Sequence, residues 1–351
     1  MNEARYLAAL LTDAAGPPPP ELSWTRLAAM ARAERVEPLV RRAAAPWLPS
    51  DIAEALDLGA RKVAFATVRT LAERDRVLLA LAAAAVAPVV LLKGAVLGWL
   101  AYPDPGLRAM NDLDLLVRDG EGAGRALTAL GYREIDCYPG RPASRGAAFE
   151  RLFARPLVPG RVNQPIEVHT GFAEALRYPV AYDDVLARAL RFPEGGPGAH
   201  RLEDVDQLLH LAVHLAREQF QGPLKHLLDV HRWVQRGSLD WDEAIRRADA
   251  WGARTSLAES LRLSAEVFGT PLPHGLLDAL GLRGARRLWL SLWNAPREGR
   301  MVRWRLPIRA SQALTLAPLM DTPRQCARFL FGYARLRLSD RRTGGSPAPP
   351  R

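Results

Sequence analysis

Two aspartates separated by one residue lie at the start of an apolar stretch of the chain. Asp112 and Asp114 belong to a segment that continues with Leu115, Leu116 and Val117. Because side chains alternate along a strand, both carboxylates would point to the same face. Carboxylates side by side on a buried strand repel each other and lose hydration, so a bound cation would stabilise them. For an all-oxygen site the simplest cation is Mg²⁺. The alternative is a solvated strand end.

A third acid and a glycine turn extend this pattern. Glu167 has apolar neighbours on a second predicted strand, and Gly94 follows an apolar run at a strand-to-helix turn. Backbone N–H groups at such a turn can face phosphate. The combination is typical of a two-metal phosphoryl- or nucleotidyl-transfer site, with two Mg²⁺ ions about 3.5–4 Å apart. Asp112 and Asp114 would bind both ions. Glu167 would complete the site of the ion that activates an acceptor hydroxyl, and could accept its proton.

Two cations and a histidine are candidate companions of the acids. Lys93 and Arg108 could grip a triphosphate, or be a snorkelling lysine at a strand end and a surface ion pair. His169 shares the face of Glu167 by strand alternation. It would either support the metal ligands or serve as a hydrogen-bonded structural histidine.

Four histidines gather further along the chain. His210 and His214 are four residues apart on one predicted helix face, a spacing that can bind zinc. His226 and His231 follow closely enough that a metal cluster is conceivable. The simpler interpretation is packing between helices.

The composition indicates a soluble globular protein. The chain has 351 residues, of which 48% are hydrophobic and 25% charged, enough for two or three domains of about 100–200 residues. Two cysteines, Cys137 and Cys326, are too few for a disulfide framework and fit a reducing cytoplasm. The N-terminus carries Glu3 and does not resemble a signal peptide. The uncharged run 77–92 contains Pro88 and is shorter than the roughly 20 residues of a membrane span.

The positive charge is concentrated at the C-terminal end. From Arg283 onward there are fifteen arginines and three acids, whereas the rest of the chain is close to neutral. Trp289, Trp293 and Trp304 are interleaved with these arginines. Such a region could bind RNA or DNA through phosphates and stacking, or lie on an anionic membrane surface. The simpler interpretation is a helical subdomain with solvated arginines and core tryptophans.

The hydrophobic periodicity predicts an α+β fold, in which a small mixed-sheet domain is flanked by helical N- and C-terminal regions. The expected division is a helical region 1–86, a catalytic domain 87–170, a helical domain 171–282, an arginine-rich helical region 283–342 and a disordered tail 343–351. Strands are expected at 89–92, 112–117, 132–136, 149–153 and 165–170. In the N-terminal region, helices are expected from Ser23 to about Ala45, at 51–65 and at 70–86.

The same segments resemble a known family. They are LLKGAVLGWLAYPDPGLRAMNDLDLLV at 91–117, Gly131-Tyr132, IEVH at 166–169 and LLHLAVHLARE at 208–218. Together they resemble the bacterial uncharacterised nucleotidyltransferase family of the DNA polymerase β-like nucleotidyltransferase superfamily. The resemblance covers roughly residues 87–240.

The resemblance implies metal-dependent transfer of a nucleoside monophosphate from an NTP, with release of pyrophosphate. Lys93-Gly94 would take the place of the glycine turn, Asp112 and Asp114 that of the metal pair, and Glu167 that of the third acid. Lys225 corresponds to a triphosphate-binding lysine that related enzymes often carry on a helix after the catalytic domain. The turn departs from the usual Gly-Ser or Gly-Gly because Ala95 follows the glycine, which removes one hydroxyl contact to phosphate. The gap from the turn to the first aspartate is also longer than the superfamily norm.

The sequence therefore predicts a cytoplasmic, Mg²⁺-dependent nucleotidyltransferase. Its acceptor would be a small molecule such as an aminoglycoside, a tRNA or a protein side chain. No motif in the helical regions shows which of these three it is. The alternative is a non-catalytic interaction protein with the same fold, which binds nucleic acid or a partner through its basic C-terminal region.

Overall fold

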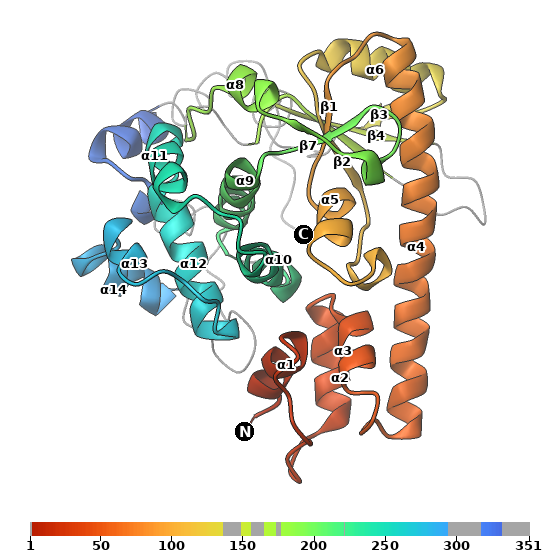
Figure 1. The fold of residues 1–351 in the computed structure, drawn as a ribbon, viewed down its shortest axis with the longest axis vertical. Coiled ribbons are helices and arrows are strands. Elements are labelled where there is room, and N and C mark those ends of the chain that lie inside the picture. Colours follow the sequence, from red (N-terminus) through yellow and green to blue (C-terminus); the bar gives the residue numbers. More distant parts are fainter. Residues whose placement is uncertain are drawn as a thin grey trace, which may run out of the picture.

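The computed structural model describes residues 2–135, 149–155, 165–172, 177–220, 222–293 and 317–331. A group of N-terminal helices, a mixed sheet and a group of C-terminal helices follow one another along the chain (Figure 1). This arrangement confirms the predicted α+β fold, in which helical regions precede and follow the sheet along the chain. The predicted domain limits remain a proposal.

The N-terminal helices are α1 (Glu3–Leu11), α2 (Trp24–Ala33), α3 (Glu37–Ala43) and α4 (Ser50–Ala83). The first two begin at side-chain caps, since Asn2 accepts a hydrogen bond from the Arg5 amide and Ser23 one from the Arg26 amide. The helix predicted from Ser23 to Ala45 is in fact two helices. They separate at Arg35, whose φ of 57° lies in the left-handed region.

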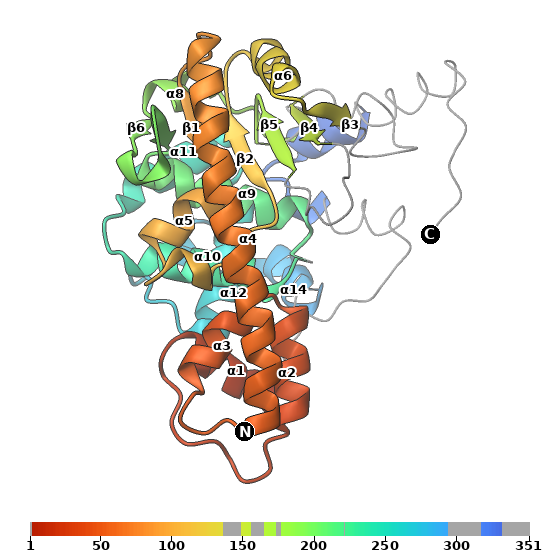
Figure 2. The ribbon, with the colours of Figure 1, turned by 90° about the vertical axis from the view of Figure 1, so that its right-hand side faces the viewer.

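Helix α4 corrects the sequence prediction in the opposite direction. The two helices predicted at 51–65 and 70–86 form one helix of 34 residues. No glycine or proline lies between Phe65 and Thr70, and the Thr70 hydroxyl donates to the Ala66 carbonyl within the helix. The continuous helix runs from the N-terminal helices to the sheet, as Figures 1 and 2 show.

The sheet has seven strands in the order β3-β4-β5-β2-β1-β7-β6. The strands are β1 (Val89–Leu91), β2 (Leu113–Leu116), β3 (Arg133–Ile135), β4 (Glu150–Ala154), β5 (Ile166–His169), β6 (Leu190–Arg191) and β7 (Ala199–Arg201). β2 is parallel to β5 and antiparallel to β1, and β1 is parallel to β7. β6 and β7 lie in the region predicted to be helical. They are two and three residues long, too short to show a periodic pattern.

Helices and short 3-10 turns cover and connect the strands. They are α5 (Gly94–Leu100), α6 (Gly120–Ala129), α8 (Tyr182–Ala187), α9 (Asp204–Arg217), α10 (Leu224–Gln235), α11 (Trp241–Trp251), α12 (Arg254–Phe268), α13 (Leu276–Ala279), α14 (Gly284–Trp293), η1 (Pro105–Leu107), η2 (Pro193–Gly195) and η3 (Ala317–Leu319). Residues 323–331 are also helical.

The two faces of the sheet contribute to different cores. Leu113 and Leu115 of β2 pack with residues of α4 and α6, whereas Leu116 belongs to the core that contains α9 and α10. By strand alternation, Asp114 shares the face of Leu116. On β5, Ile166 and Val168 belong to the α4 and α6 side. The acids of the central strands therefore face the C-terminal helices.

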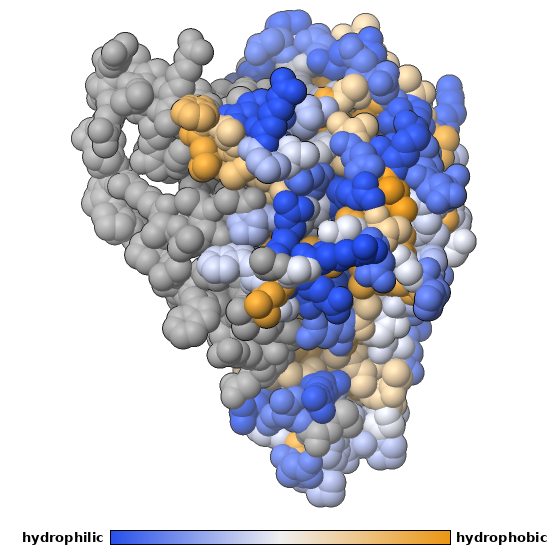
Figure 3. Space-filling view, turned by 90° about the vertical axis from the view of Figure 1, so that its left-hand side faces the viewer, coloured by the Kyte–Doolittle hydropathy of each residue, from blue (hydrophilic) through white to orange (hydrophobic). Residues whose placement is uncertain are grey.

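Only part of the arginine-rich region lies in the described residues. Arg286 of α14 donates to the Thr255 hydroxyl at 3.3 Å, which ties this helix to α12. Trp304, Cys137 and the tail 343–351 lie outside the described residues. On the face that carries the C-terminal helices, hydrophilic residues cover most of the described surface between scattered apolar ones (Figure 3). Among the described helices, none combines the length and apolar character needed to cross a membrane.

Candidate active site

The pairing of β2 with β5 brings the predicted acids together. In this parallel register Asp114 lies opposite Glu167, and Leu116 lies opposite His169. The His169 Nε2 atom is 3.1 Å from Asp114 Oδ1 and 3.5 Å from Glu167 Oε2. One ligand atom from each of the three side chains lies within 4.8 Å of the other two. Residues more than 50 positions apart in sequence thus converge on the sheet face that looks towards α9.

Lys93 provides the positive charge of this cluster. Its Nζ donates to Asp114 Oδ1 at 2.5 Å and lies 3.6 Å from Glu167 Oε2. Lys93 follows β1 with φ 45° and ψ −120°, a conformation that non-glycine residues rarely adopt. Such a conformation costs about 1–3 kcal/mol.

Gly94 allows the turn after Lys93 to pack closely. A Cβ atom at this position would lie 2.5 Å from Nη1 of Arg108 and would overlap the side chain of Met110. The glycine is thus needed for space, because its φ is not positive. It brings the first residue of α5 against a buried guanidinium.

The acids of the cluster differ in their tendency to ionise. Burial opposes the charged form of Asp114, but Lys93 and the hydrogen bond with His169 hold its pKa well below the usual range. Burial raises the pKa of Glu167 to about 7, with the Asp114 charge adding to the rise. Burial, followed by the charge of Asp114, also raises the pKa of Asp112. The local positive charge is therefore insufficient for three carboxylates.

A second charged cluster lies beside the first. Arg108 is buried and forms a two-pronged ion pair with Asp229 of α10, with nitrogen–oxygen distances of 3.1 and 2.7 Å. The Tyr102 hydroxyl donates to the same carboxylate at 2.7 Å. Lys225 donates to the Ala109 carbonyl at 3.1 Å. Burial and the neighbouring Arg108 lower the pKa of Lys225 to about 7.

Several sequence interpretations are corrected here. Arg108 is not in a surface ion pair, because only 5% of its side chain is exposed. Asp112 lies just before β2 and is partly exposed, whereas Asp114 is 2% exposed. The two aspartates therefore do not sit equally on one buried strand. They remain close enough for each to affect the ionisation of the other.

Sequence reasoning missed Asp229 and left His169 undecided between two roles. Asp229 follows Lys225 by one helical turn on a mostly apolar helix face. The available signal in the sequence was therefore an acid among apolar residues at that spacing. His169 contacts both Asp114 and Glu167. It is thus a direct partner of the acids rather than a distant structural residue.

The carboxylates suit a divalent cation. Asp112, Asp114 and Glu167 carry three potential negative charges, and Lys93 is the cation that contacts two of them among the described residues. Carboxylate oxygens are the ligands that Mg²⁺ prefers. His169 would then hold Asp114 in place by its hydrogen bond, as the outer partners of metal ligands commonly do.

The four histidines of the C-terminal helices, for which packing between helices was the simpler interpretation, do not form one cluster. His231 shares a 2.8 Å hydrogen bond with the Thr270 hydroxyl, and His210 packs against Phe172 with a ring-centroid distance of 4.7 Å. His214 and His226 do approach each other, with ring centroids 4.9 Å apart.

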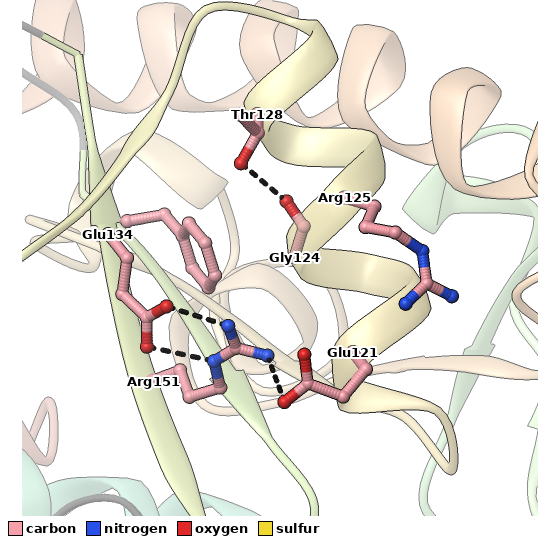
Figure 4. A pocket seen from close by; sticks show the side chains of 7 residues that line it. Glu121, Gly124, Arg125, Thr128, Glu134 and Arg151 are labelled. Atoms are coloured by element: carbon pink, nitrogen blue, oxygen red, sulfur yellow. Dashed lines mark hydrogen bonds and ion pairs between the residues drawn. The ribbon is translucent and has the colours of Figure 1, made fainter.

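A separate surface pocket lies between α6, β3 and β4. Arg151 crosses it to pair with Glu134 and Glu121, while Arg125 and Thr128 project from α6 (Figure 4). It contains none of the clustered acids, and its own ion pairs satisfy Arg151. The pocket and the carboxylate cluster are therefore separate.

Comparison with known proteins identifies the family of the chain. The sequence profile of a family described as uncharacterised nucleotidyltransferase matches residues 20–269, well over half of the chain. Comparisons with curated proteins and with solved structures gave no significant match. The matched range contains the carboxylates, the Lys93-Gly94 turn and both charged helices α9 and α10. The chain belongs to the uncharacterised nucleotidyltransferase family, and its enzymatic class is nucleotidyl transfer.

Proposed function

We propose that the protein is a Mg²⁺-dependent enzyme that transfers a nucleoside monophosphate from an NTP to an acceptor. The observation that carries this proposal is the β2–β5 register, which sets Asp114 beside Glu167 on one sheet face next to Lys93. The reaction is in-line attack of an acceptor oxygen, or another nucleophile, on the α-phosphorus. The bond from that phosphorus to the bridging oxygen breaks, and pyrophosphate leaves. We also propose membership of the DNA polymerase β-like superfamily.

The three carboxylates would hold two Mg²⁺ ions. Asp114, Glu167 and Asp112 would provide oxygen ligands, and the ions would supply positive charge to neutralise the triphosphate and lower the pKa of the acceptor hydroxyl. Glu167 is partly exposed, with 20% of its side chain accessible, and burial raises its pKa to about 7. It is therefore suited to accept the proton of the acceptor.

The neighbouring cations would bind the triphosphate. Lys93 lies at the carboxylates, and Arg108 is held rigidly against the Gly94 turn by Asp229. Lys225 lies close enough to Asp112 for the two charges to interact. Because Asp229 already neutralises Arg108, Lys93 would supply most of the positive charge for the phosphates. Lys225 would supply part of it, since its pKa is lowered to about 7.

For the acceptor we propose three classes of molecule. A small molecule, a tRNA and a protein side chain each provide a suitable nucleophile. The low cysteine content fits a reducing compartment, and we place the enzyme in the cytoplasm.

A nucleotide-transfer assay tests the proposal. Each labelled NTP is incubated with Mg²⁺ and a cell extract as a source of acceptors, with wild-type protein or the variant carrying Asp112→Asn and Asp114→Asn. The wild type should bind a nucleotide and transfer its label, and the double variant should lose transfer. Asp183→Asn is the matched control, because this carboxylate is 79% exposed in a surface ion pair. Equal nucleotide binding and transfer by wild type and double variant would overturn the proposal.

A further inference from the structure

A second group of possible metal ligands lies on the C-terminal helices. His214 and Glu218 are one turn apart at the end of α9, and His226 lies in the first turn of α10. One ligand atom of each residue lies within 4.8 Å of the other two. The group shares no residue with the carboxylate cluster on the sheet. It also combines two residues singled out by the sequence with an acid that sequence reasoning missed.

Two of the three distances between the ligand atoms can be compared with the edges of a metal tetrahedron. Glu218 Oε2 is 2.9 Å from His226 Nδ1 and 3.9 Å from His214 Nδ1. Bonds of about 2.0–2.1 Å from a tetrahedral zinc ion place its ligands about 3.3 Å apart. The two measured distances lie on either side of that value. Changes of about half an ångström would bring both distances to that value, and the two histidine nitrogens lie within 4.8 Å of each other.

The backbone next to the group leaves room for these side chains. A Cβ atom at Gly222 would overlap both the Glu218 carboxylate and the His226 ring. The three side chains are also reachable, with 15% of His214, 37% of Glu218 and 16% of His226 exposed. An ion could therefore enter from solvent, and a ligand position would remain open towards it.

A simple hydrogen bond does not account for the whole group. The Glu218–His226 contact at 2.9 Å satisfies those two residues, but His214 Nδ1 at 3.9 Å is too far from the carboxylate for a hydrogen bond. The third side chain nevertheless converges on the same point.

We propose that His214, Glu218 and His226 bind a divalent transition-metal ion of the zinc type. Two imidazoles and one carboxylate form the three-ligand set of zinc sites that keep an open fourth position. Nitrogen ligands select against Mg²⁺, which prefers oxygen. This site is therefore chemically distinct from the carboxylate centre, and its existence does not depend on the proposed function.

Cobalt spectroscopy on the full-length, metal-free protein tests this site. Co²⁺ replaces zinc in such sites and absorbs visible light most strongly when its coordination is tetrahedral. The wild type should bind one equivalent with a visible absorption band that Zn²⁺ removes. His226→Gln and Glu218→Gln should each weaken Co²⁺ binding at least about tenfold. Gly222→Ala should weaken it by displacing the ligands without altering them.

Two controls make the result specific. His274→Gln removes an exposed histidine elsewhere and should leave the band unchanged. The variant carrying Asp114→Asn and Glu167→Gln should also keep it, because those acids belong to the other centre. The proposal is overturned if the wild type shows no stoichiometric band, or if the band survives in the three site variants. Loss of the band in the Asp114 and Glu167 variant alone would overturn it as well. Circular dichroism identifies any variant that fails to fold, and the remaining site variants then decide.

Discussion

Lys93 is the residue whose role in the cluster is easiest to isolate. Its ammonium lies against Asp114 and Glu167, where it would compete with the proposed metal ion for the same oxygens. Lys93→Met keeps the length of the side chain and removes the charge. We expect Mn²⁺, used as a spectroscopic substitute for Mg²⁺, to bind about tenfold more tightly to this variant, which corresponds to about 1.4 kcal/mol. Nucleotide transfer should fall because the triphosphate loses a cation.

Electron paramagnetic resonance measures free Mn²⁺ in this titration. Lys62→Met is a suitable control, because Lys62 is exposed on α4. Unchanged or weaker Mn²⁺ binding by Lys93→Met would show that the ammonium does not compete with a metal.

The Asp229–Arg108 pair should matter for stability because it is buried. Replacing Asp229 by alanine leaves the guanidinium unpaired, which costs about 3–5 kcal/mol for a buried ion pair. Asp183→Ala removes a partner of Arg118 in a pair of similar length, but both its side chains are exposed, by 63% and 79%. That change should cost no more than about 1 kcal/mol. Urea unfolding compares the two variants, and similar losses would contradict the role of burial.

The candidate residues were predictable from sequence to different degrees. Asp114 was predictable because it forms a pair with Asp112 in an apolar segment, and alternation then assigns its face. Glu167 was predictable only together with that pair, because single carboxylates on strands are common. The position of Asp112 just before the strand depends on where pairing begins, which the pattern does not specify. The partnership of Arg108 with Asp229 joins residues 121 positions apart. No local pattern contains that contact.

At the scale of elements, the five strands from β1 to β5 appear near their expected positions, and α9 to α12 lie in the region predicted to be helical. β7 was missed, yet it pairs with β1 and supports the strand that leads to Lys93. Its order depends on that pairing rather than on its own three residues, so tertiary contacts decided its structure.

Gly131 shows how one residue ends an element. It follows α6 with φ +86°, and a Cβ at this position would meet no atom within 4 Å. Gly131→Ala should therefore destabilise the protein by about 1–2 kcal/mol through backbone strain alone. Gly16→Ala is the matched control, because that glycine is equally open but its φ is not positive. It should be neutral or slightly stabilising. Equal effects on the midpoint of urea unfolding would exclude strain as the cause.

At the scale of the whole molecule, the helical regions do more than cover the sheet. Residues of α1, α3, α9, α10 and α12 belong to one continuous apolar core, which reaches the sheet at Val90 and Leu116. The face of the sheet that carries Asp114 is therefore closed by α9 and α10. Helices distant in sequence thus determine which groups can approach the carboxylates, and this explains why the acceptor could not be read from the strand motifs.

Buried histidines should make the stability of the whole molecule depend on pH. Burial, and to a lesser degree Arg232, lowers the pKa of His231 to about 4, compared with about 6.5 in an unfolded chain. Between these values the unfolded chain binds the additional proton, so folding stability falls as pH decreases from about 6.5 to 4.

The urea midpoint of the wild type should decrease between pH 7.5 and pH 4.5. His231→Gln should be less stable at pH 7.5, because it disturbs the hydrogen bond with Thr270, but should lose less stability on acidification. His210, whose pKa burial lowers to about 3, would maintain part of the change of the urea midpoint with pH in this variant. His274→Gln replaces an exposed histidine and should show the same change as the wild type. An identical pH dependence in His231→Gln and wild type would show that the pKa of His231 is the same in the folded and the unfolded chain.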